Sequence, residues 1–315
     1  MKYIQDIHEG DRISDIYLCK QKQSAITKNG KPYEIVTLQD KTGVLDSKIW
    51  EPSSPGINDF SAMDYVFVTG RVISFQGNLQ LNIERLRTAK PEEYQAEDYL
   101  PVSEKNIDQM YQEILDRIEK FKNPYLKQLS ESFFKNDSFA RAFKFHSAAK
   151  SVHHGFVGGL LEHTLNVTKM CEQYCELYPM LKRDLLVTAA IFHDVGKLKE
   201  ISRFPLNDYT DEGQLIGHIV IGYQMLADRI AQIDGFPKQL EHELLHCILS
   251  HHGELEYGSP KKPALMEAFA LSLADNTDAK LETLREAFRS LPKDNVQWQG
   301  YHRFLETNIR QTGEL

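Results

Sequence analysis

FHDVGK, residues 192–197, is the stretch of this chain that says most about its fold and its chemistry. The adjacent His193 and Asp194 offer one neutral nitrogen and one anionic oxygen to a single divalent cation. That mixture of ligands is typical of a catalytic hydrolytic metal, whereas a structural zinc usually takes thiolates. Because a His-Asp pair also occurs by chance, the interpretation depends on further ligands elsewhere in the sequence.

Further ligand-type side chains recur around this pair, each within a predicted helix or at a helix end. A single inward histidine is more often a hydrogen-bonded core residue than a ligand, but an inward carboxylate is costly to bury unless paired or metal-bound. His163 and Asp275 both fall on inward apolar stripes. The number of such groups in one domain therefore favours a metal site. The candidate ligands are His163, His193, Asp194, His218, His251, His252 and Asp275.

Two cations lie close to these ligands in the sequence. Lys197 follows Asp194 by three residues, so a continued helix would place both on one face. It would complement the dipole of a helix end, with Gly196 as the stop, or contact a phosphate oxygen beside the metal. Arg183 is expected to pair with the neighbouring Asp184 at a helix start, and a place near the metal is the alternative.

Length, composition and cysteine usage are those of a two-domain globular protein. The chain has 315 residues, of which 41% are hydrophobic and 26% charged, and domains typically span about 100–200 residues. No apolar run approaches the roughly 20 residues of a membrane span, and the N-terminus lacks a signal-peptide core. Four cysteines without a C-x-x-C pair indicate reduced thiols and a cytoplasmic setting.

The net charge of −8 argues against a general affinity for nucleic acid. The acidic excess lies entirely in residues 91–315, while residues 1–90 are close to neutral. Any contact with a polyanion must therefore be local, through clustered cations and metal, and not through the field of the whole protein.

The first ninety residues read as five β-strands. Alternating apolar residues and two hairpin turns, at 41–43 and 76–78, support this assignment, and each turn contains a glycine where a positive φ is expected. Five strands with two hairpins and a short connector are typical of a small closed barrel of the oligonucleotide-binding (OB) type, with an SH3-like barrel as the competing fold. The predicted strands are 12–20, 33–39, 44–50, 65–75 and 78–86.

A charged segment with two prolines, residues 91–102, is predicted to be a linker, and nearly everything after it to be helical. The expected fold class is multidomain, β followed by all-α. An OB barrel would occupy 1–90 and a helical domain 103–315, with the motifs concentrated in 151–279. The predicted helices are 103–122, 124–145, 159–178, 183–193, 214–233, 237–252, 263–288 and 296–310.

One face of the predicted barrel offers residues that suit a single nucleic-acid strand. Lys48, Trp50, Arg71 and Phe75 are expected to face outward. Aromatic side chains that stack on bases, interleaved with cations that contact phosphates, are the usual elements of such a surface. In the alternative interpretation, Trp50 and Phe75 pack on the helical domain.

A second candidate for substrate contact lies just before the predicted helix that carries His163. His153 and His154 precede a turn rich in glycine that leads into this helix. A phosphate could bind there, near a helix N-terminus. The alternative is that both histidines are polar loop residues.

The order of His163 in LLEHTLNV, His193-Asp194 in HDVGK and Asp275 in SLADNTD resembles the HD-domain superfamily of metal-dependent phosphohydrolases. The resemblance implies an all-helical fold that holds a divalent metal through these four residues. It also identifies the helical domain as the enzymatic part of the chain.

His218 in IGHIVIG and His251-His252 in LSHHGE resemble members of that superfamily with a second metal. The HD-GYP cyclic-dinucleotide phosphodiesterases are one such branch. This chain reads HHGELEYGSP from the double histidine and lacks their GYP signature, which argues against cyclic-dinucleotide hydrolysis.

The whole chain, with the barrel, the helical domain and the segment SVHHGFVGGLLEHT (151–164), is similar to the YhaM family of bacterial 3′-5′ exoribonucleases. The resemblance covers nearly the full length. It implies degradation of single-stranded RNA, some activity on single-stranded DNA, dependence on manganese and a cytoplasmic setting. The direction of degradation follows from this resemblance alone.

The candidate ligands suit a two-metal centre, in which cations about 3.5–4 Å apart activate water and neutralise the phosphate. Asp194 is the expected bridging ligand, because a carboxylate can span two cations and an imidazole cannot. Lys197 would help to bind the phosphate. The donors suit manganese, iron or zinc better than calcium. We assign His163, His193 and Asp275 to one metal, His218 and His251 to the other, and His252 as a further ligand or a proton donor to the leaving group.

The leading function is therefore a 3′-5′ exoribonuclease whose barrel holds single-stranded RNA while the helical domain hydrolyses its end. One alternative is an HD-type nucleotide or cyclic-nucleotide phosphohydrolase with an accessory OB domain. Another is a non-catalytic single-strand-binding, replication-accessory protein that keeps a metal for stability, although the full ligand set argues against it. Outward apolar residues in 296–310 permit a homo-oligomer.

Overall fold

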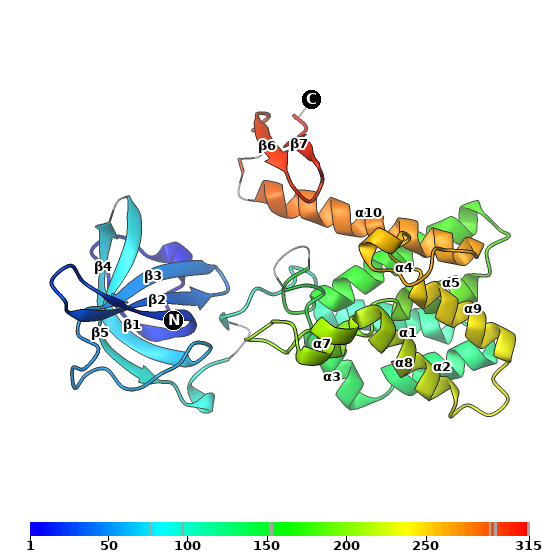
Figure 1. Ribbon diagram of the computed structural model, residues 1–315, viewed down its shortest axis with the longest axis horizontal. Helices are drawn as coiled ribbons and strands as arrows, with labels where there is room; N and C mark the ends of the chain where they lie inside the picture. The colour runs from blue at the N-terminus through cyan, green and yellow to red at the C-terminus, as the bar shows by residue number, and fades with distance from the viewer. Residues whose placement is uncertain (76, 96–97, 151–153, 290, 293–294, 314–315) are drawn as a thin grey trace. The chain divides into compact units, whose positions relative to one another are not determined.

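The chain divides into two compact units, each with its own hydrophobic core. The first is a β-barrel and the second is largely helical (Figure 1). Met1–Val102 and Arg203–Leu206 make up the first unit, and Ser103–Ser202 and Asn207–Leu315 make up the second. The computed structural model describes residues 1–75, 77–95, 98–150, 154–289, 291–292 and 295–313.

The first unit is a closed barrel of five strands. They are β1 Arg12–Ile26, β2 Pro32–Asp40, β3 Gly43–Ile49, β4 Tyr65–Phe75 and β5 Asn78–Thr88, with short helices η1 Ile4–Asp6 and η2 Pro91–Glu93. The long strand β1 pairs with both β2 and β4, and a parallel pairing of β3 with β5 completes the barrel. This is the OB arrangement, so the predicted barrel is confirmed.

The turn between β2 and β3 is stabilised by a side chain and not by the glycine that the sequence suggested. The carboxylate of Asp40 accepts hydrogen bonds from the backbone N–H groups of Thr42 and Gly43, at 2.7 and 3.2 Å. Gly43 does not adopt the positive φ expected of it, whereas Gly77 in the second hairpin does, with φ +85°. An Asp carboxylate that binds the backbone two residues on is a common alternative way to form a tight turn.

The segment predicted as a linker packs on the barrel. The side chains of Tyr99 and Leu100 are buried, and the ring of Tyr94 stacks on Tyr65 with centroids 3.8 Å apart. Burial of large aromatic surfaces stabilises this segment, although its prolines and charges alone suggested a free connection.

The second unit consists of helices around a single core. Two of the predicted helices are interrupted. The predicted helix 124–145 restarts at Asn136, whose side chain caps the next helix, and the helix 214–233 breaks at Gly217, which has φ +79°. The helices are α1 Ile107–Glu119, α2 Pro124–Phe134, α3 Asp137–Phe145, α4 Gly159–Leu177, α5 Arg183–Phe192, α6 Lys197–Glu200, α7 Asp211–Ile216, α8 His218–Ile230, α9 Lys238–Leu249, η4 Leu255–Tyr257 and α10 Met266–Arg289.

The C-terminal segment is a hairpin, so the helix predicted over 296–310 is wrong. Strand β6 Trp298–His302 pairs with β7 Thr307–Arg310 beyond the C-terminal end of α10 (Figure 1). Gly300 has φ +85°, which a helix does not allow, and the aromatic residues of β6 favour extended backbone.

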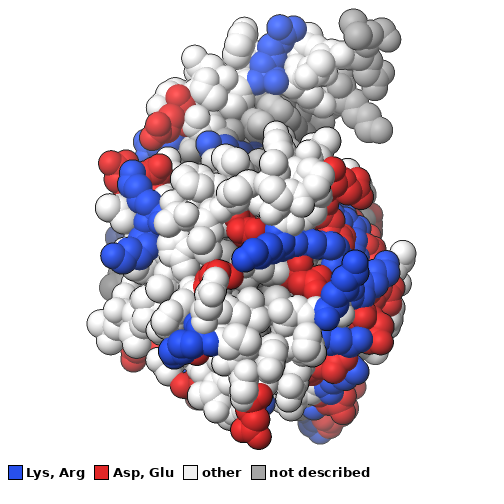
Figure 2. Space-filling model, turned by 90° about the vertical axis from the view of Figure 1, so that its right-hand side faces the viewer, with Lys and Arg blue, Asp and Glu red and all other residues white. Residues whose placement is uncertain are grey.

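On the face of the molecule shown in Figure 2, charged residues of both signs occur together. Figure 2 shows Lys and Arg interleaved with Asp and Glu along one side of the face in view, and mostly uncharged residues over the rest. Among the described residues, none of the helices combines the length and apolar character of a membrane span.

Candidate functional site

Ligand-type side chains from separate helices converge in the helical unit. Among the described residues, three groups of ligand atoms lie within 4.8 Å of one another, and two of these groups are the triads of the candidate site. The first triad is His163 on α4, His193 after α5 and Asp275 on α10, and the second triad is His218 at the start of α8 with His251 and His252 after α9. All six residues were candidates on sequence grounds.

The first triad is deeply buried and contains a carboxylate. His163 Nε2 lies 3.0 Å from His193 Nε2 and 3.2 Å from Asp275 Oδ1. His193 Nε2 lies 3.8 Å from the same oxygen. Ligands that each bind one cation at about 2.1 Å are about 3.0–3.4 Å apart in octahedral or tetrahedral geometry. The spacing therefore suits three ligands of one metal.

The second triad has three imidazoles and lies closer to solvent. His218 Nε2 is 3.3 Å from His252 Nε2, and the rings of His251 and His252 meet edge to face with centroids 4.4 Å apart. His251 is buried, whereas the side chain of His218 is 12% exposed. Their ligand atoms have the spacing of a second cation site.

Asp194 lies between the two triads and presents one oxygen to each. Its Oδ2 is 3.3 Å from His163 Nε2 and 3.5 Å from His193 Nε2. Its Oδ1 is 3.5 Å from His218 Nε2 and 3.7 Å from His251 Nε2. A single buried carboxylate therefore has access to both positions.

Backbone carbonyl groups orient three of the histidines. Nδ1 of His193 and of His251 each faces the carbonyl oxygen three residues earlier, at 2.8 and 2.7 Å, and His252 Nδ1 lies 2.7 Å from the carbonyl oxygen of Tyr257. A carbonyl oxygen only accepts, so each neutral ring carries its proton on Nδ1 and offers the Nε2 lone pair. Burial lowers the pKa of His193 to about 4 and that of His252 to about 3, so both rings are neutral at neutral pH.

Two carboxylates that sequence reasoning missed orient the other two histidines. His163 Nδ1 lies 2.7 Å from Asp278 Oδ2, and His218 Nδ1 lies 2.8 Å from Glu200 Oε1. Such partners are common behind metal-binding histidines, because they hold the ring and its tautomer. The one available signal was for Asp278, which follows Asp275 by three residues and so shares its face of α10.

The converging atoms fit a cation better than they fit one another. Asp194 Oδ1 and His251 Nε2 are buried without a hydrogen-bond donor among the described residues, at a typical cost of about 1–3 kcal/mol each. Burial lowers the pKa of His163, but the carboxylates of Asp194, Asp275 and Asp278 outweigh it and raise that pKa well above its usual value. The site therefore favours positive charge, and its residues suit divalent metal ions.

The FHDVGK turn packs tightly against the start of α8. Gly196 is not the helix stop that was expected, because its φ of −64° and ψ of −22° are helical. A Cβ at this position would lie 2.0 Å from the backbone oxygen of His218. The absence of a side chain is what allows the turn to approach α8 and so brings Asp194 close to His218.

Lys197 lies beside Asp194 as predicted, although the helix does not continue between them: α5 ends at Phe192 and Lys197 begins α6. Its Nζ is 2.8 Å from Asp194 Oδ2, and its side chain is 14% exposed. Burial lowers the pKa of Lys197, but the charge of Asp194 outweighs burial and raises it. The ammonium group therefore stays charged next to the oxygen that faces the first triad.

The predictions for the two histidines before α4, His153 and His154, have different outcomes. His153 lies outside the described residues. His154 is fully buried, and its Nε2 lies 2.8 Å from Asp278 Oδ2. That position, behind a metal-type ligand, suits a positioning role better than the direct phosphate contact that was expected.

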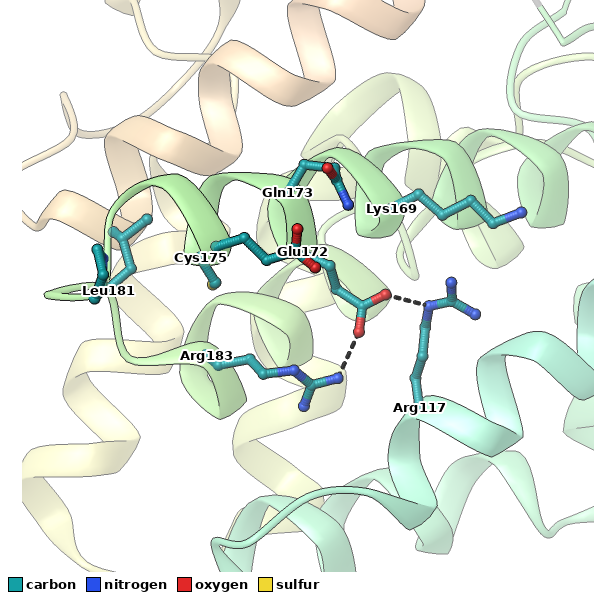
Figure 3. A pocket seen from close by; sticks show the side chains of 9 residues that line it. Arg117, Lys169, Glu172, Gln173, Cys175, Leu181 and Arg183 are labelled. Atoms are coloured by element: carbon teal, nitrogen blue, oxygen red, sulfur yellow. Dashed lines mark hydrogen bonds and ion pairs between the residues drawn. The ribbon is translucent and has the colours of Figure 1, made fainter.

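Arg183 belongs to an ion-pair cluster at the C-terminal half of α4, so the helix-start interpretation holds and the alternative near the metal does not. It pairs with Asp184 at 3.3 Å and with Glu172 at 2.5 Å. Figure 3 shows Glu172 between the guanidinium groups of Arg183 and Arg117. These residues line a pocket of about 680 Å³.

The outer face of the barrel carries an aromatic and cationic cluster. Trp50 stacks on Tyr33, a residue that sequence reasoning missed, with ring centroids 5.2 Å apart. Lys48 Nζ lies 5.0 Å from the Trp50 ring and 5.1 Å from the Phe75 ring. Trp50 and Phe75 are 46% and 48% exposed.

Arg71 lies beside this cluster, in register on β4 with Asn82 of β5. The side chain of Asn82 in turn accepts a hydrogen bond from the Trp50 indole at 3.0 Å. The four barrel residues proposed from the sequence therefore share one exposed face.

Comparison with known proteins gives a family model for the helical unit and a solved structure of low similarity. The HD domain family model matches residues 160–280. The second OB-fold domain of replication protein A from Methanococcus maripaludis, a solved structure, matches 28% of this chain and 94% of its own, with 16% identity and a TM-score of 0.22.

The alignments with enzymes of the genus Bacillus run along most of the chain. Over 281 residues the chain is 34% identical to the 3′-5′ exoribonuclease YhaM of Bacillus velezensis, with 87% of each chain covered. Over 287 residues it is 33% identical to YhaM of Bacillus subtilis (strain 168), with 89% of each covered. Because this similarity exceeds 30% identity and covers most of the chain, the chain belongs to the YhaM family of 3′-5′ exoribonucleases.

Proposed function

We propose that this chain is a metal-dependent 3′-5′ exoribonuclease and that its two triads, joined by Asp194, are the catalytic centre. Membership of the YhaM family supports the activity, the substrate class and the direction. The observation that carries the assignment of the centre is the position of Asp194, whose Oδ2 faces the first triad and whose Oδ1 faces the second. This arrangement suits two divalent cations.

In the proposed centre, Asp194 would hold both cations, and the first triad would complete one position and the second triad the other. When bound, the cations would activate a water molecule and neutralise charge on the scissile phosphate. The contacts of His252 support a ligand role over proton donation to the leaving group. Its Nδ1 proton faces the carbonyl oxygen of Tyr257, and burial lowers its pKa to about 3, so Nε2 has no proton to give.

We propose manganese as the metal. Together, the two triads and Asp194 offer imidazole nitrogens and carboxylate oxygens, a set that suits manganese, iron or zinc better than calcium. No cysteine belongs to either triad, which removes the thiolate preference of structural zinc sites. The resemblance to the YhaM family favours manganese among the remaining metals.

Lys197 has two roles in this proposal. In the free enzyme its ammonium group holds Asp194 through the contact at Oδ2. In the substrate complex the same group would contact a phosphate oxygen, because a buried cation beside the centre stabilises the negative charge that develops there.

The barrel face would guide the RNA strand. Tyr33, Trp50 and Phe75 offer ring surfaces for bases, and Lys48 and Arg71 offer cations for phosphates. Stacking of a base on an aromatic side chain contributes about 1–3 kcal/mol and depends little on base identity. Such a surface suits a strand that is shortened without regard to sequence.

The central experiment is incubation of the protein with 5′-labelled single-stranded RNA, with and without Mn²⁺. Stepwise shortening from the 3′ end that requires Mn²⁺ is the expected result. Hydrolysis of mononucleotides without any action on oligomers would instead favour the nucleotide phosphohydrolase. A protein that binds the RNA without shortening it would select the non-catalytic alternative.

A second experiment separates the barrel from the centre. Trp50→Ala should raise KM for a long RNA by about tenfold, the equivalent of one lost stacking contact, and leave cleavage of a dinucleotide unchanged. Trp298→Ala, at an exposed tryptophan of the C-terminal hairpin, is the matched control. An equal effect of both variants would remove the barrel face from the proposal.

A further inference from the structure

Asp278 on α10 binds three side chains at once and is not one of the proposed metal ligands. Its Oδ2 lies 2.7 Å from His163 Nδ1 and 2.8 Å from His154 Nε2. Its Oδ1 accepts a hydrogen bond from Asn166 at 2.9 Å. The residue is 8% exposed. A buried carboxylate with this many donors is held rigidly, and it holds its donors in turn.

Asp278, His154 and His163 could in principle hold a third metal, since their ligand atoms are clustered. The distances argue otherwise. Two ligands of one cation at about 2.1 Å are about 3.0 Å apart or more, whereas these contacts are hydrogen-bond lengths of 2.7 and 2.8 Å. His163 would also have to give both ring nitrogens to cations. These three residues therefore form a hydrogen-bond network behind the first triad.

His163 needs such a partner more than His193 and His251 do. His193 and His251 each use the free carbonyl at the end of their own helix. His163 lies within α4, where backbone carbonyls are taken up by the helix. A side chain from another helix can therefore orient its ring, and among the described residues Asp278 lies within hydrogen-bond distance of Nδ1.

The same carboxylate also anchors the segment that leads into α4. His154 has φ +61°, an uncommon value for a residue with a side chain. Its backbone oxygen accepts a hydrogen bond from Ala148 at 3.0 Å, and a Cβ on Gly159 would lie 1.9 Å from that oxygen. The contact of Asp278 with the His154 ring therefore helps to keep a strained and tightly packed segment in place.

We propose that Asp278 is a positioning residue of the metal centre: it fixes the tautomer and orientation of His163 so that Nε2 faces the first-triad metal, with His154 and Asn166 as its supports. This inference rests on the proposed function of the two triads. Removal of the Asp278 charge is expected to weaken the first-triad metal by about 10–100-fold, the usual effect of losing such a partner. The second-triad metal should bind as before.

The test is a calorimetric Mn²⁺ titration of metal-free protein, for the wild type, Asp278→Asn and Asn166→Ala. Asp228→Asn, at an exposed carboxylate of α8, is the matched control. We expect two binding steps in every protein, the tighter of them at the first triad because it alone contains Asp275. This tighter step should be weakened about 10–100-fold in Asp278→Asn and by less in Asn166→Ala. Asn166→Ala, which leaves Asp278 in place, keeps the test available if Asp278→Asn unfolds.

The outcomes separate this inference from the proposed function. Loss of one bound Mn²⁺ from a total of three in Asp278→Asn would identify a third metal site and overturn the positioning role. Unchanged affinities in both variants would overturn it as well, while the centre itself stands. Absence of Mn²⁺ binding by the wild-type protein would instead contradict the proposed centre.

Discussion

The two triads of the proposed centre are built from the same kinds of residue but differ in charge and in exposure. The first triad contains Asp275, and its histidines are almost fully buried. The second triad has three imidazoles, and His218 has some contact with solvent. Both share Asp194. The first position therefore has access to two carboxylates and the second to one.

This difference predicts unequal metal sites. A second anionic ligand in a buried, poorly hydrated position strengthens the attraction for a divalent cation. The first triad should therefore bind its metal first and keep it. The second triad should exchange its metal more readily. An open, exchangeable position is also where a substrate phosphate would replace water most easily. The asymmetry suggests a division of labour within one centre.

Replacement of Asp194, the ligand that both triads share, should impair both metal sites together. Asp194→Asn leaves one accepting oxygen, so it should lower the hydrolysis rate on single-stranded RNA by about 10³-fold, the equivalent of roughly 4 kcal/mol of metal-dependent stabilisation. Asp116→Asn, at an exposed position of α1, is the control. A single-turnover rate within tenfold of the wild type would contradict the bridging role.

A variant of one metal ligand should weaken metal binding at one triad only. After removal of metal with a chelator, Mn²⁺ titration should show that Asp275→Asn loses the tight step and that His251→Asn loses the weak one. Each affinity should fall by at least about 100-fold, because these residues are ligands and not their supports. If both variants weaken the same step, the triads do not bind separate metals.

The partner carboxylates should give a smaller effect with the same selectivity. Glu200 orients His218 as Asp278 orients His163. Glu200→Gln should therefore weaken the second-triad metal by about 10–100-fold and leave the tight step unchanged. Glu176→Gln, at an exposed residue of α4, controls for the loss of charge. Weakening of the tight step by Glu200→Gln would show that the two sites are not independent.

Replacement of Lys197 should give the smallest effect of these variants, and it should act at the first-triad site. Its ammonium is next to Asp194 Oδ2, so Lys197→Met should leave Mn²⁺ affinity equal or higher by removing a competing cation. The rate at saturating RNA should fall by about tenfold, as expected for a lost hydrogen bond of about 1.5 kcal/mol to a charged group. A lower Mn²⁺ affinity with an unchanged rate would mean that Lys197 only supports Asp194.

The sequence predicted the elements whose signals are local and periodic. Alternating apolar residues marked the barrel strands, and apolar stripes marked the helices and the inward direction of His163 and Asp275. Elsewhere the prediction of secondary structure failed, because contacts outside the local pattern determine the structure. The predicted linker is held by stacking of Tyr94 on Tyr65, and the helix predicted over 296–310 is a hairpin.

Gly196 illustrates why a residue can be noticed for the wrong reason. As a glycine after a helix it suggested a stop, but its backbone is helical and its lack of a side chain serves contact with His218. The close approach involves a residue 22 positions later in the chain. No local pattern contains that information.

The chain by itself determined which ligand types are available and how some of them are oriented. His193 and His251 follow helices, so the carbonyl three residues earlier sets the tautomer of each. Only the tertiary structure decided that Asp194 faces two triads and that Asp278, 115 residues from His163, supports it. Such contacts depend on how helices pack, and helix packing is set by the whole core and not by the neighbouring sequence.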